Sequence, residues 1–228
     1  FRRVLFRSQG LGAVLIVTVF VQIFWFFGIH GPNVLAPVLE GIWGQAQLIN
    51  IDIFQKGYEG KTGTAAVLAA IDDGKAYMWV RGSFDAFAWF GGSGGTIVLI
   101  IAILLFSKRA DYLTVGKLSL GPGIFNINEP IMFGLPVVLN PIMFIPFVIA
   151  PLVATTIGWV ATYLGLVAPV SQQVAWVTPP LLLSFLATGA DWRAPIVALV
   201  CMVVTFLIWT PFVIAANKMD PALGESEQ

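Results

Sequence analysis

A series of prolines within an almost purely apolar stretch limits the folds open to this chain. Five prolines follow one another at intervals of five or six residues: Pro130, Pro136, Pro141, Pro146 and Pro151. Each proline inside a helix removes a backbone hydrogen bond and clashes with the preceding turn, so we predict that no straight helix crosses this region. Backbone that is not helical lies at membrane depth only where it is buried in protein or lines a cavity. The series therefore predicts a re-entrant hairpin around the sequence NINEP.

The composition places these prolines in a membrane protein. Hydrophobic residues make up 58% of the 228 residues and charged residues only 11%, and the mean hydropathy is +0.88, whereas a soluble domain carries about 25% charged residues. Fourteen prolines and 23 glycines favour broken helices, which membrane proteins tolerate where neighbouring elements satisfy the freed backbone groups. We therefore expect an all-α membrane protein with transmembrane helices, two re-entrant hairpins and Pro/Gly-broken helices. Because the net charge is zero, no nucleic-acid partner is expected.

Four apolar segments are long enough to cross a bilayer core, which takes about 20 residues of helix. They cover residues 11–29, 84–106, 147–167 and 195–216. Residues 31–54 are too polar to face lipid and too apolar for a solvated loop, so we expect a re-entrant hairpin or an interfacial helix there.

Both ends of the chain differ from its central region. The first eight residues contain three arginines, and a long apolar run follows them. A cationic signal peptide is one interpretation, but the apolar run is too long and lacks an A-x-A-like cleavage site. We expect instead that the chain is a fragment, that residues 1–8 are non-native or frayed, and that residues 218–228 form a polar tail.

Glu129 is the first candidate for a catalytic residue. It lies in NINEPIMFG with no cation within ten residues along the chain. An acidic side chain beside apolar membrane sequence is energetically expensive, so it indicates a functional site. The alternative is that Glu129 only stabilises the positive end of a helix that begins at Pro130. The two roles are compatible.

His30 is the second candidate and the only histidine in the chain. It lies where an apolar helix ends, in the sequence GIHGPN. Gly28 and Gly31 allow backbone or ligand to approach closely, and Pro32 prevents the helix from continuing. These neighbours favour a ligand contact over the alternative, a structural histidine that satisfies a helix end.

Asparagine and tryptophan side chains are candidates for substrate binding. Asn33, Asn126 and Asn128 each offer an amide acceptor and donor, which suit a neutral ligand rich in hydroxyls. Trp25 and Trp176 lie near helix breaks, and indole rings stack on the apolar faces of sugars. The alternatives are turn capping for the asparagines and membrane-interface anchoring for the tryptophans.

Cys201 is the only cysteine, and it lies in an apolar run. A single cysteine forms no intrachain disulfide, and the sequence contains no Cys/His cluster with metal-ligand spacing. We expect neither a metal nor a cofactor, and we interpret Cys201 as a small packing residue.

Four stretches together resemble the membrane permease subunit, enzyme IIC, of the bacterial phosphoenolpyruvate-dependent sugar phosphotransferase system. They are FWFFGIHGPNVLAPV, GIFNINEPIMFGLPVVLNP, AWVTPP and ATGADWRAP, and they are most similar to the lactose/cellobiose/chitobiose branch. The resemblance covers residues 10–217 and corresponds to the C-terminal half of such a permease. It therefore implies that residues 9–217 form a substrate-binding transport domain.

The resemblance also implies a fold, a set of partners and roles for particular residues. It implies an all-helical, multi-pass protein of the bacterial cytoplasmic membrane that forms a homodimer among lipids. His30 and Glu129 match the family's histidine and glutamate beside the sugar hydroxyl that receives phosphate, and Trp25 and Trp176 match aromatic positions that stack on the sugar. In the family the phosphoryl donor is a cysteine on a separate IIB subunit, so Cys201 is not that donor.

These implications lead to a hypothesis for the function. The permease binds a disaccharide of the cellobiose, chitobiose or lactose type and holds its 6-hydroxyl between His30 and Glu129, with Glu129 as general base, while phosphorylated IIB delivers the phosphate. One alternative is an ion-coupled secondary transporter that uses Glu129 as its coupling carboxylate. Another is a membrane scaffold that binds no sugar. The sequence leaves open which disaccharide is carried and whether the chain is an enzyme by itself.

Overall fold

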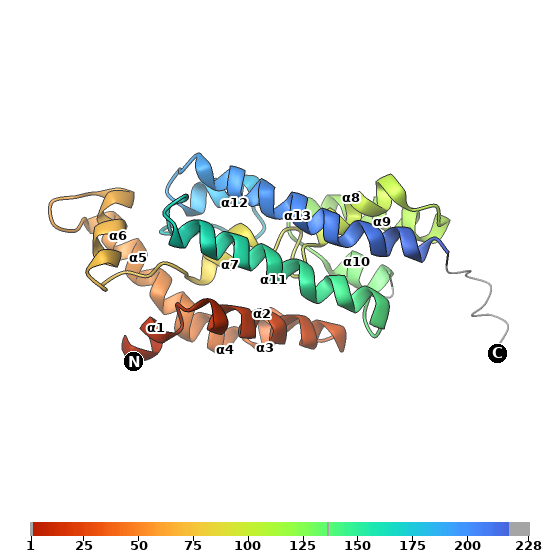
Figure 1. Ribbon diagram of the computed structural model, residues 1–228, viewed down its shortest axis with the longest axis horizontal. Coiled ribbons are helices and arrows are strands. Elements are labelled where there is room, and N and C mark those ends of the chain that lie inside the picture. The colour runs from red at the N-terminus through yellow and green to blue at the C-terminus, as the bar shows by residue number, and fades with distance from the viewer. Residues whose placement is uncertain (1, 136, 219–228) are drawn as a thin grey trace.

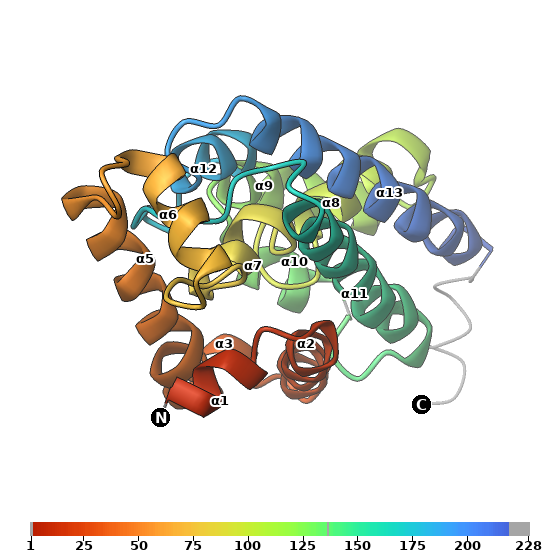
Figure 2. The same cartoon turned by 60° about the vertical axis from the view of Figure 1, so that its left-hand side comes forward.

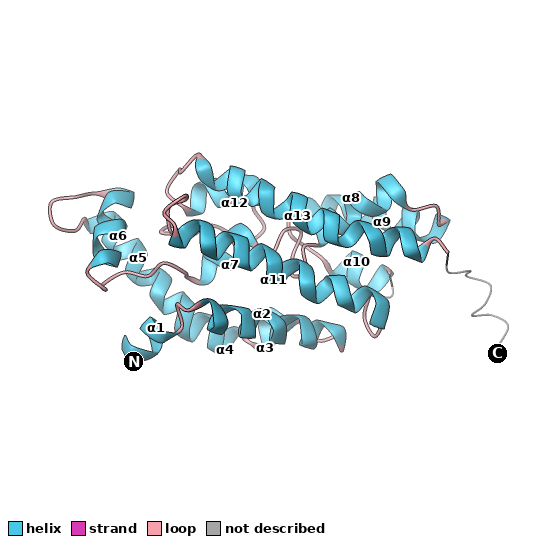
Figure 3. Cartoon of the chain, in the orientation of Figure 1, coloured by secondary structure: helices cyan, strands magenta, loops and turns pink. Residues whose placement is uncertain are grey.

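The computed structural model describes residues 2–135 and 137–218 (Figure 1). Within these residues every regular element is a helix and none is a β-strand (Figure 3), which confirms the all-α prediction. The helices in chain order are α1 (Arg2–Arg7), α2 (Leu11–Phe26), α3 (Gly31–Val34), α4 (Ala36–Val38), the π-helix η1 (Leu39–Gly44), α5 (Gln45–Lys56), α6 (Gly63–Asp72), α7 (Arg81–Phe87), α8 (Thr96–Phe106), α9 (Ala110–Ile124), α10 (Glu129–Gly134), α11 (Pro141–Tyr163), α12 (Pro180–Ala187) and α13 (Arg193–Ala216).

Among the described residues, α11 and α13 are long and apolar enough to cross a membrane. The two helices lie side by side, with α2 against α11 and α8 against α13 (Figures 1 and 2). Helices α2 and α8 are also apolar but shorter. The predicted segments 147–167 and 195–216 correspond to α11 and α13, although α11 begins earlier than expected, at Pro141.

The proline series does not exclude a long helix, so that prediction is wrong for residues 141–163. Helix α11 is continuous through Pro146 and Pro151. Both prolines are buried, and Phe147 beside them is 0% exposed. Packing of this buried face offsets the roughly 3 kcal/mol that an interior proline costs. At the start of the helix the side chain of Asn140 accepts hydrogen bonds from the backbone N–H groups of the second and third helical residues. Pro141 at the first helical position is typical of a helix start. This proline therefore marks where α11 begins, whereas Pro146 and Pro151 lie inside the helix.

The sequence NINEP connects two helices that pack against each other. Helix α9 ends at Ile124, residues 125–128 form a turn, and α10 begins at Glu129. Pro130 lies in the first turn of α10. Backbone N–H groups in the first turn have no carbonyl partner within the helix, so the missing N–H of proline costs no helical hydrogen bond there. The sequence therefore located a break correctly, and the re-entrant course of these residues through a membrane stays a prediction.

The predicted span 84–106 is wrong, because these residues form two helices rather than one. Helix α7 ends at Phe87 and α8 begins at Thr96. Between them Gly91, Gly92, Gly94 and Gly95 have φ angles of 73°, 96°, 94° and 68°, in the left-handed region that only glycine adopts at little cost. We call residues 88–95 the glycine segment. A Cβ atom on Gly92 would lie 2.7 Å from Cγ of Asn128, so the missing side chains let this segment approach the turn at 125–128.

Residues 31–56 are almost entirely helical, and the re-entrant hairpin or interfacial helix expected over residues 31–54 stays a prediction. Helices α3 and α4, the π-helix η1 and α5 follow one another there, and α6 packs back on α5 at one end of the molecule (Figure 1). A π-helix carries one extra residue per turn and is frequent at functional sites. Helix α1 packs through Leu5, which belongs to the hydrophobic core. The interpretation of residues 1–8 as a non-native end stays a prediction, and the predicted tail lies, apart from Lys218, outside the described residues.

Candidate functional site

A cavity of about 280 Å³ brings together most of the residues that the sequence singled out. We call it the first pocket. Four separate parts of the chain line it: the start of α3, the first turn of α7 with the glycine segment, the turn before α10, and the segment before α12. The lining residues are His30, Pro32, Asn33, Arg81, Asp85, Trp89, Gly92, Ser93, Asn126, Asn128, Glu129 and Trp176.

His30 and Glu129 face each other in the first pocket. The distance from Nε2 of His30 to Oε1 of Glu129 is 3.8 Å, and the two side chains are 36% and 46% exposed. This separation is too long for a direct hydrogen bond, whereas a hydroxyl oxygen beside the line that joins the two atoms can lie at hydrogen-bond distance, about 2.8 Å, from both. The other ring nitrogen of His30, Nδ1, accepts the backbone N–H of Asn33 at 3.2 Å and so caps α3.

The two predicted tryptophans occupy different places. Trp176 is 55% exposed and lines the first pocket, where its ring can contact a ligand. Trp25 is 1% exposed and lies against the imidazole of His30, with 4.7 Å between the ring centroids. Trp25 therefore supports His30 from the protein interior and is not among the residues that line the pocket.

The three predicted asparagines differ in how much of their amide is left for a ligand. Asn126 uses all of it, because Nδ2 donates to the carbonyls of Trp176 and Thr178 at 2.7 and 2.8 Å while Oδ1 accepts the N–H of Gly91 at 2.8 Å. Asn128 donates to the carbonyl of Ser93 at 3.1 Å. Asn33 is exposed, and within the described residues its side-chain amide makes no hydrogen bond. Asn126 thus holds the pocket wall together, and Asn33 is the freest to contact a ligand.

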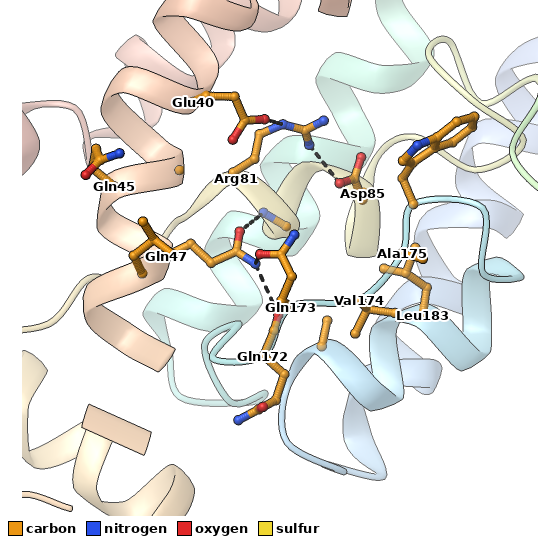
Figure 4. A pocket seen from close by; sticks show the side chains of 15 residues that line it. Glu40, Gln45, Gln47, Arg81, Asp85, Gln172, Gln173, Val174, Ala175 and Leu183 are labelled. Atoms are coloured by element: carbon orange, nitrogen blue, oxygen red, sulfur yellow. Dashed lines mark hydrogen bonds and ion pairs between the residues drawn. The ribbon is translucent and has the colours of Figure 1, made fainter. Parts of the chain in front are cut away.

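An ion-pair cluster that the sequence reasoning missed borders the first pocket. Arg81 donates from Nε to Glu40 at 3.0 Å and from Nη1 to Asp85 at 2.7 Å (Figure 4), and its guanidinium lies 4.9 Å from the ring centroid of Trp89. Burial raises the pKa of the Asp85 carboxyl, and the nearby Arg81 acts in the opposite direction. The available signal was the spacing of Arg81 and Asp85, four residues apart in an apolar stretch, which places opposite charges on one helix face.

Cys201 lies outside the first pocket. It is buried in α13, and its Sγ lies 3.6 Å from the carbonyl oxygen of Ala154 in α11. This is the packing role that the sequence predicted. Among the described residues no three His, Cys, Asp or Glu side chains lie close enough together to hold a metal ion.

The fold and the site define a class of protein: an all-helical protein whose described residues include two helices long and apolar enough to cross a membrane and a polar pocket with a histidine–glutamate pair. The family described as "Phosphotransferase system, EIIC" matches residues 2–151. The chain therefore belongs to the EIIC family of the phosphotransferase system.

Comparison with individual proteins gives the same family. The chain is 58% identical over 219 residues to the PTS system cellobiose-specific EIIC component of Lactococcus lactis subsp. lactis (strain IL1403). The aligned region covers 93% of this chain and 44% of that relative. It is 36% identical over 222 residues to the PTS system oligo-beta-mannoside-specific EIIC component of Bacillus subtilis (strain 168). This aligned region covers 97% of this chain and 47% of that relative.

One similar solved structure is that of the transporter ChbC, the IIC component from the N,N'-diacetylchitobiose-specific phosphotransferase system. The TM-score is 0.84 at 32% sequence identity, and the match covers 97% of this chain and 48% of that chain. This chain therefore spans about half the length of the proteins that it matches.

Proposed function

We propose that this chain binds a disaccharide in the membrane and presents its 6-hydroxyl for phosphorylation by a partner IIB subunit during uptake. The observation that carries the proposal is the pair of facing atoms in the first pocket, Nε2 of His30 and Oε1 of Glu129, 3.8 Å apart. The exposed ring of Trp176 lines the same pocket. A sugar stacked on that ring can place one hydroxyl between the two side chains.

The chemical step follows from this placement. The sugar hydroxyl accepts a hydrogen bond from Nε2–H of His30 and donates its proton to the carboxylate of Glu129, which acts as general base. The hydroxyl oxygen attacks the phosphorus of a phosphocysteine on IIB, the P–S bond breaks, and the cysteine leaves as a thiolate. Glu129 then returns the proton to solvent. Cys201 takes no part, because it is buried in α13.

We propose cellobiose as the sugar, because the relative that is 58% identical over 219 residues is a cellobiose-specific EIIC component. The binding groups suit a neutral ligand. The amide of Asn33 offers a donor and an acceptor at the rim of the first pocket. Trp25 has a supporting role in this proposal, because it packs under His30.

The membership of the EIIC family supports further proposals about the setting of this site. We propose that residues 9–217 act as the substrate-binding transport domain, and that the protein crosses the bacterial cytoplasmic membrane several times. We propose also that it works as a homodimer surrounded by lipid, with phosphorylated IIB as its protein partner. Helices α11 and α13 are the described helices that are long enough to span a bilayer.

The experiment that tests the function follows cellobiose in proteoliposomes. Supplied with IIB and its phosphoryl donors, the protein should convert cellobiose to its 6-phosphate. The matched control is a IIB subunit whose phosphorylated cysteine is replaced by serine, which should abolish the product. Cellobiose accumulation driven by a proton or sodium gradient without IIB would contradict the proposal and support ion-coupled transport through Glu129.

A further inference from the structure

We propose that the common end of α8 and α13 binds the phosphate headgroup of an anionic membrane lipid through Lys108 and Lys218. The proposal goes beyond the proposed sugar transport and does not depend on it. Lys108 lies two residues after the end of α8, and Lys218 lies two residues after the end of α13. Both lysines are exposed, and the two helices pack against each other (Figure 1).

The side chain of Asn217 ties the two helix ends together. Its Nδ2 donates to the carbonyl of Phe106, the last residue of α8, at 2.9 Å, and its Oδ1 accepts the backbone N–H of Lys108 at 2.8 Å. Lys218 follows Asn217 directly in the chain. The two flexible lysine side chains therefore start from neighbouring points of the backbone and can reach the same ligand.

The helix surfaces that lead up to the two lysines are apolar and exposed. Leu105 and Phe106 are exposed in the last turn of α8, and Ile214 is exposed in the last turn of α13. Because α13 is long and apolar enough to cross a membrane, these side chains suit contact with lipid tails. Lysines just beyond such a surface place their charges at the level of the lipid headgroups.

The charges at this end favour an anionic ligand. Within the described residues neither Lys108 nor Lys218 forms an ion pair. The neighbouring Arg109 lies 2.6 Å from the carboxylate of Asp111, so this pair adds no net charge. Two ammonium groups thus remain for a phosphate at the membrane surface.

The opposite end of α13 is balanced in charge. Arg193, at the start of this helix, lies 2.9 Å from the carboxylate of Asp191. An anionic headgroup would meet a guanidinium that is already paired there. The preference for an anionic lipid should therefore belong to the end that carries Lys108 and Lys218.

A role within the protein is the alternative for these lysines. Cations near the C-terminus of a helix interact favourably with its last carbonyls and with the negative end of its dipole. In this structure the carbonyl of Phe106 already accepts a hydrogen bond from Asn217. The two roles differ in experiment, because an interaction with the helix end requires no lipid and shows no preference between lipids.

The test measures lipid binding to the purified protein in detergent by native mass spectrometry. The probes are phosphatidylglycerol, which carries a net negative charge, and phosphatidylcholine, which has the same phosphate but is neutral overall. The unsubstituted protein should bind phosphatidylglycerol more tightly. Replacing Lys108 and Lys218 together by glutamine should weaken phosphatidylglycerol binding by about fivefold for each lysine and leave phosphatidylcholine binding unchanged.

Two controls separate the site from a general effect of charge. Lys61→Gln removes a lysine that is also exposed and, among the described residues, forms no ion pair. It lies between α5 and α6 at the other end of the molecule (Figure 1), so this variant should leave both affinities unchanged. Replacing Lys108 and Lys218 by arginine keeps both charges and should keep the preference for phosphatidylglycerol.

Three results would overturn the lipid site. The first is equal binding of the two lipids by the unsubstituted protein, and the second is an unchanged preference in the double glutamine variant. The third is release of phosphatidylglycerol by millimolar inorganic phosphate, which would assign the lysines to a free anion. Sugar phosphorylation is measured separately, so none of these results changes the proposed function.

Discussion

The two ring nitrogens of His30 have different partners, and this difference sets the chemistry of the residue. Nδ1 accepts the backbone N–H of Asn33, while Nε2 faces Glu129. A nitrogen that accepts a hydrogen bond carries no proton, so in the neutral imidazole the proton lies on Nε2. The cap of α3 therefore selects the tautomer that the proposed hydroxyl contact requires.

His30→Asn should separate the capping role from the catalytic role. Asparagine is among the best N-cap residues, so α3 and the folded yield should be kept. Its side chain is too short to place a donor opposite Glu129, so the phosphorylation rate at saturating cellobiose should fall by about 100-fold or more. The rate is measured together with the yield of folded protein in detergent. A normal rate at saturating sugar would show that the imidazole only caps the helix.

Glu129→Gln should remove the general base with little change of shape. We expect the phosphorylation rate to fall by about 100-fold or more while cellobiose still binds within a few-fold of its original affinity. Glu59→Gln is the matched control, because Glu59 is an exposed carboxylate in the loop between α5 and α6. Near-normal turnover in Glu129→Gln would remove Glu129 from the proposed mechanism.

Trp176→Ala should weaken cellobiose binding by about three- to tenfold, which corresponds to the 0.5–1.5 kcal/mol typical of an aromatic contact. Trp192→Ala is the matched control, since Trp192 is also exposed but does not line the first pocket. Trp192→Ala should leave the affinity unchanged. Equal losses in the two variants, measured by calorimetry, would mean that the ligand does not lie on Trp176.

At this scale the sequence located some of the residues in the pocket and missed others for a physical reason. His30 and Glu129 were found because each is chemically unusual in its own neighbourhood, and Trp176 because it lies beside a Pro-Pro break. Arg81 was not singled out, since its partner Glu40 comes from a distant element. The role of an asparagine also depends on distant residues. The side chain of Asn126 binds backbone carbonyls about 50 residues away, at Trp176 and Thr178, and local sequence does not reveal these partners.

At the scale of the elements, the turn before α10 holds two other segments in place. Through its side chain Asn126 binds the glycine segment at Gly91 and the segment that carries Trp176. The left-handed glycines let the chain come close enough for the first of these contacts. The long apolar helix α13 was predictable because its hydropathy is local. The break between α7 and α8 was missed because glycine-rich sequence is compatible both with close helix packing and with a left-handed loop.

Asn126→Asp should release the segment that carries Trp176. The change keeps the acceptor for Gly91 and replaces the two bonds donated to the carbonyls of Trp176 and Thr178 by repulsion between oxygens. We expect a loss of about 1–3 kcal/mol in the free energy of unfolding, weaker cellobiose binding, and faster hydrogen exchange in residues 171–178. Asn217→Asp should serve as control, since Asn217 makes a comparable amide bond to the carbonyl of Phe106 outside the first pocket. It should lower stability without changing sugar affinity, and the same loss of affinity in both variants would contradict the proposed clamp.

At the scale of the whole molecule, the first pocket is a meeting point of segments that are distant in sequence. Residues near 30, 85, 128 and 176 line it, and they belong to α7 or lie just before α3, α10 and α12. Local sequence can nominate single members of such a pocket, but the pocket itself exists only when the helices have packed. Ligand binding should therefore act on all four segments together.

Cellobiose should stabilise the protein as a unit. At a concentration about 100 times its dissociation constant, a ligand that binds only the folded state raises the free energy of unfolding by about 2.7 kcal/mol. Hydrogen exchange should slow together in residues 30–34, 85–93, 125–129 and 171–178, because local opening of any of them breaks the bound state. The same concentration of sucrose controls for solvent exclusion, which also favours compact states, and should slow exchange without singling out these segments. Protection confined to one segment would show that the sugar contacts that segment alone and that the first pocket is not the binding site.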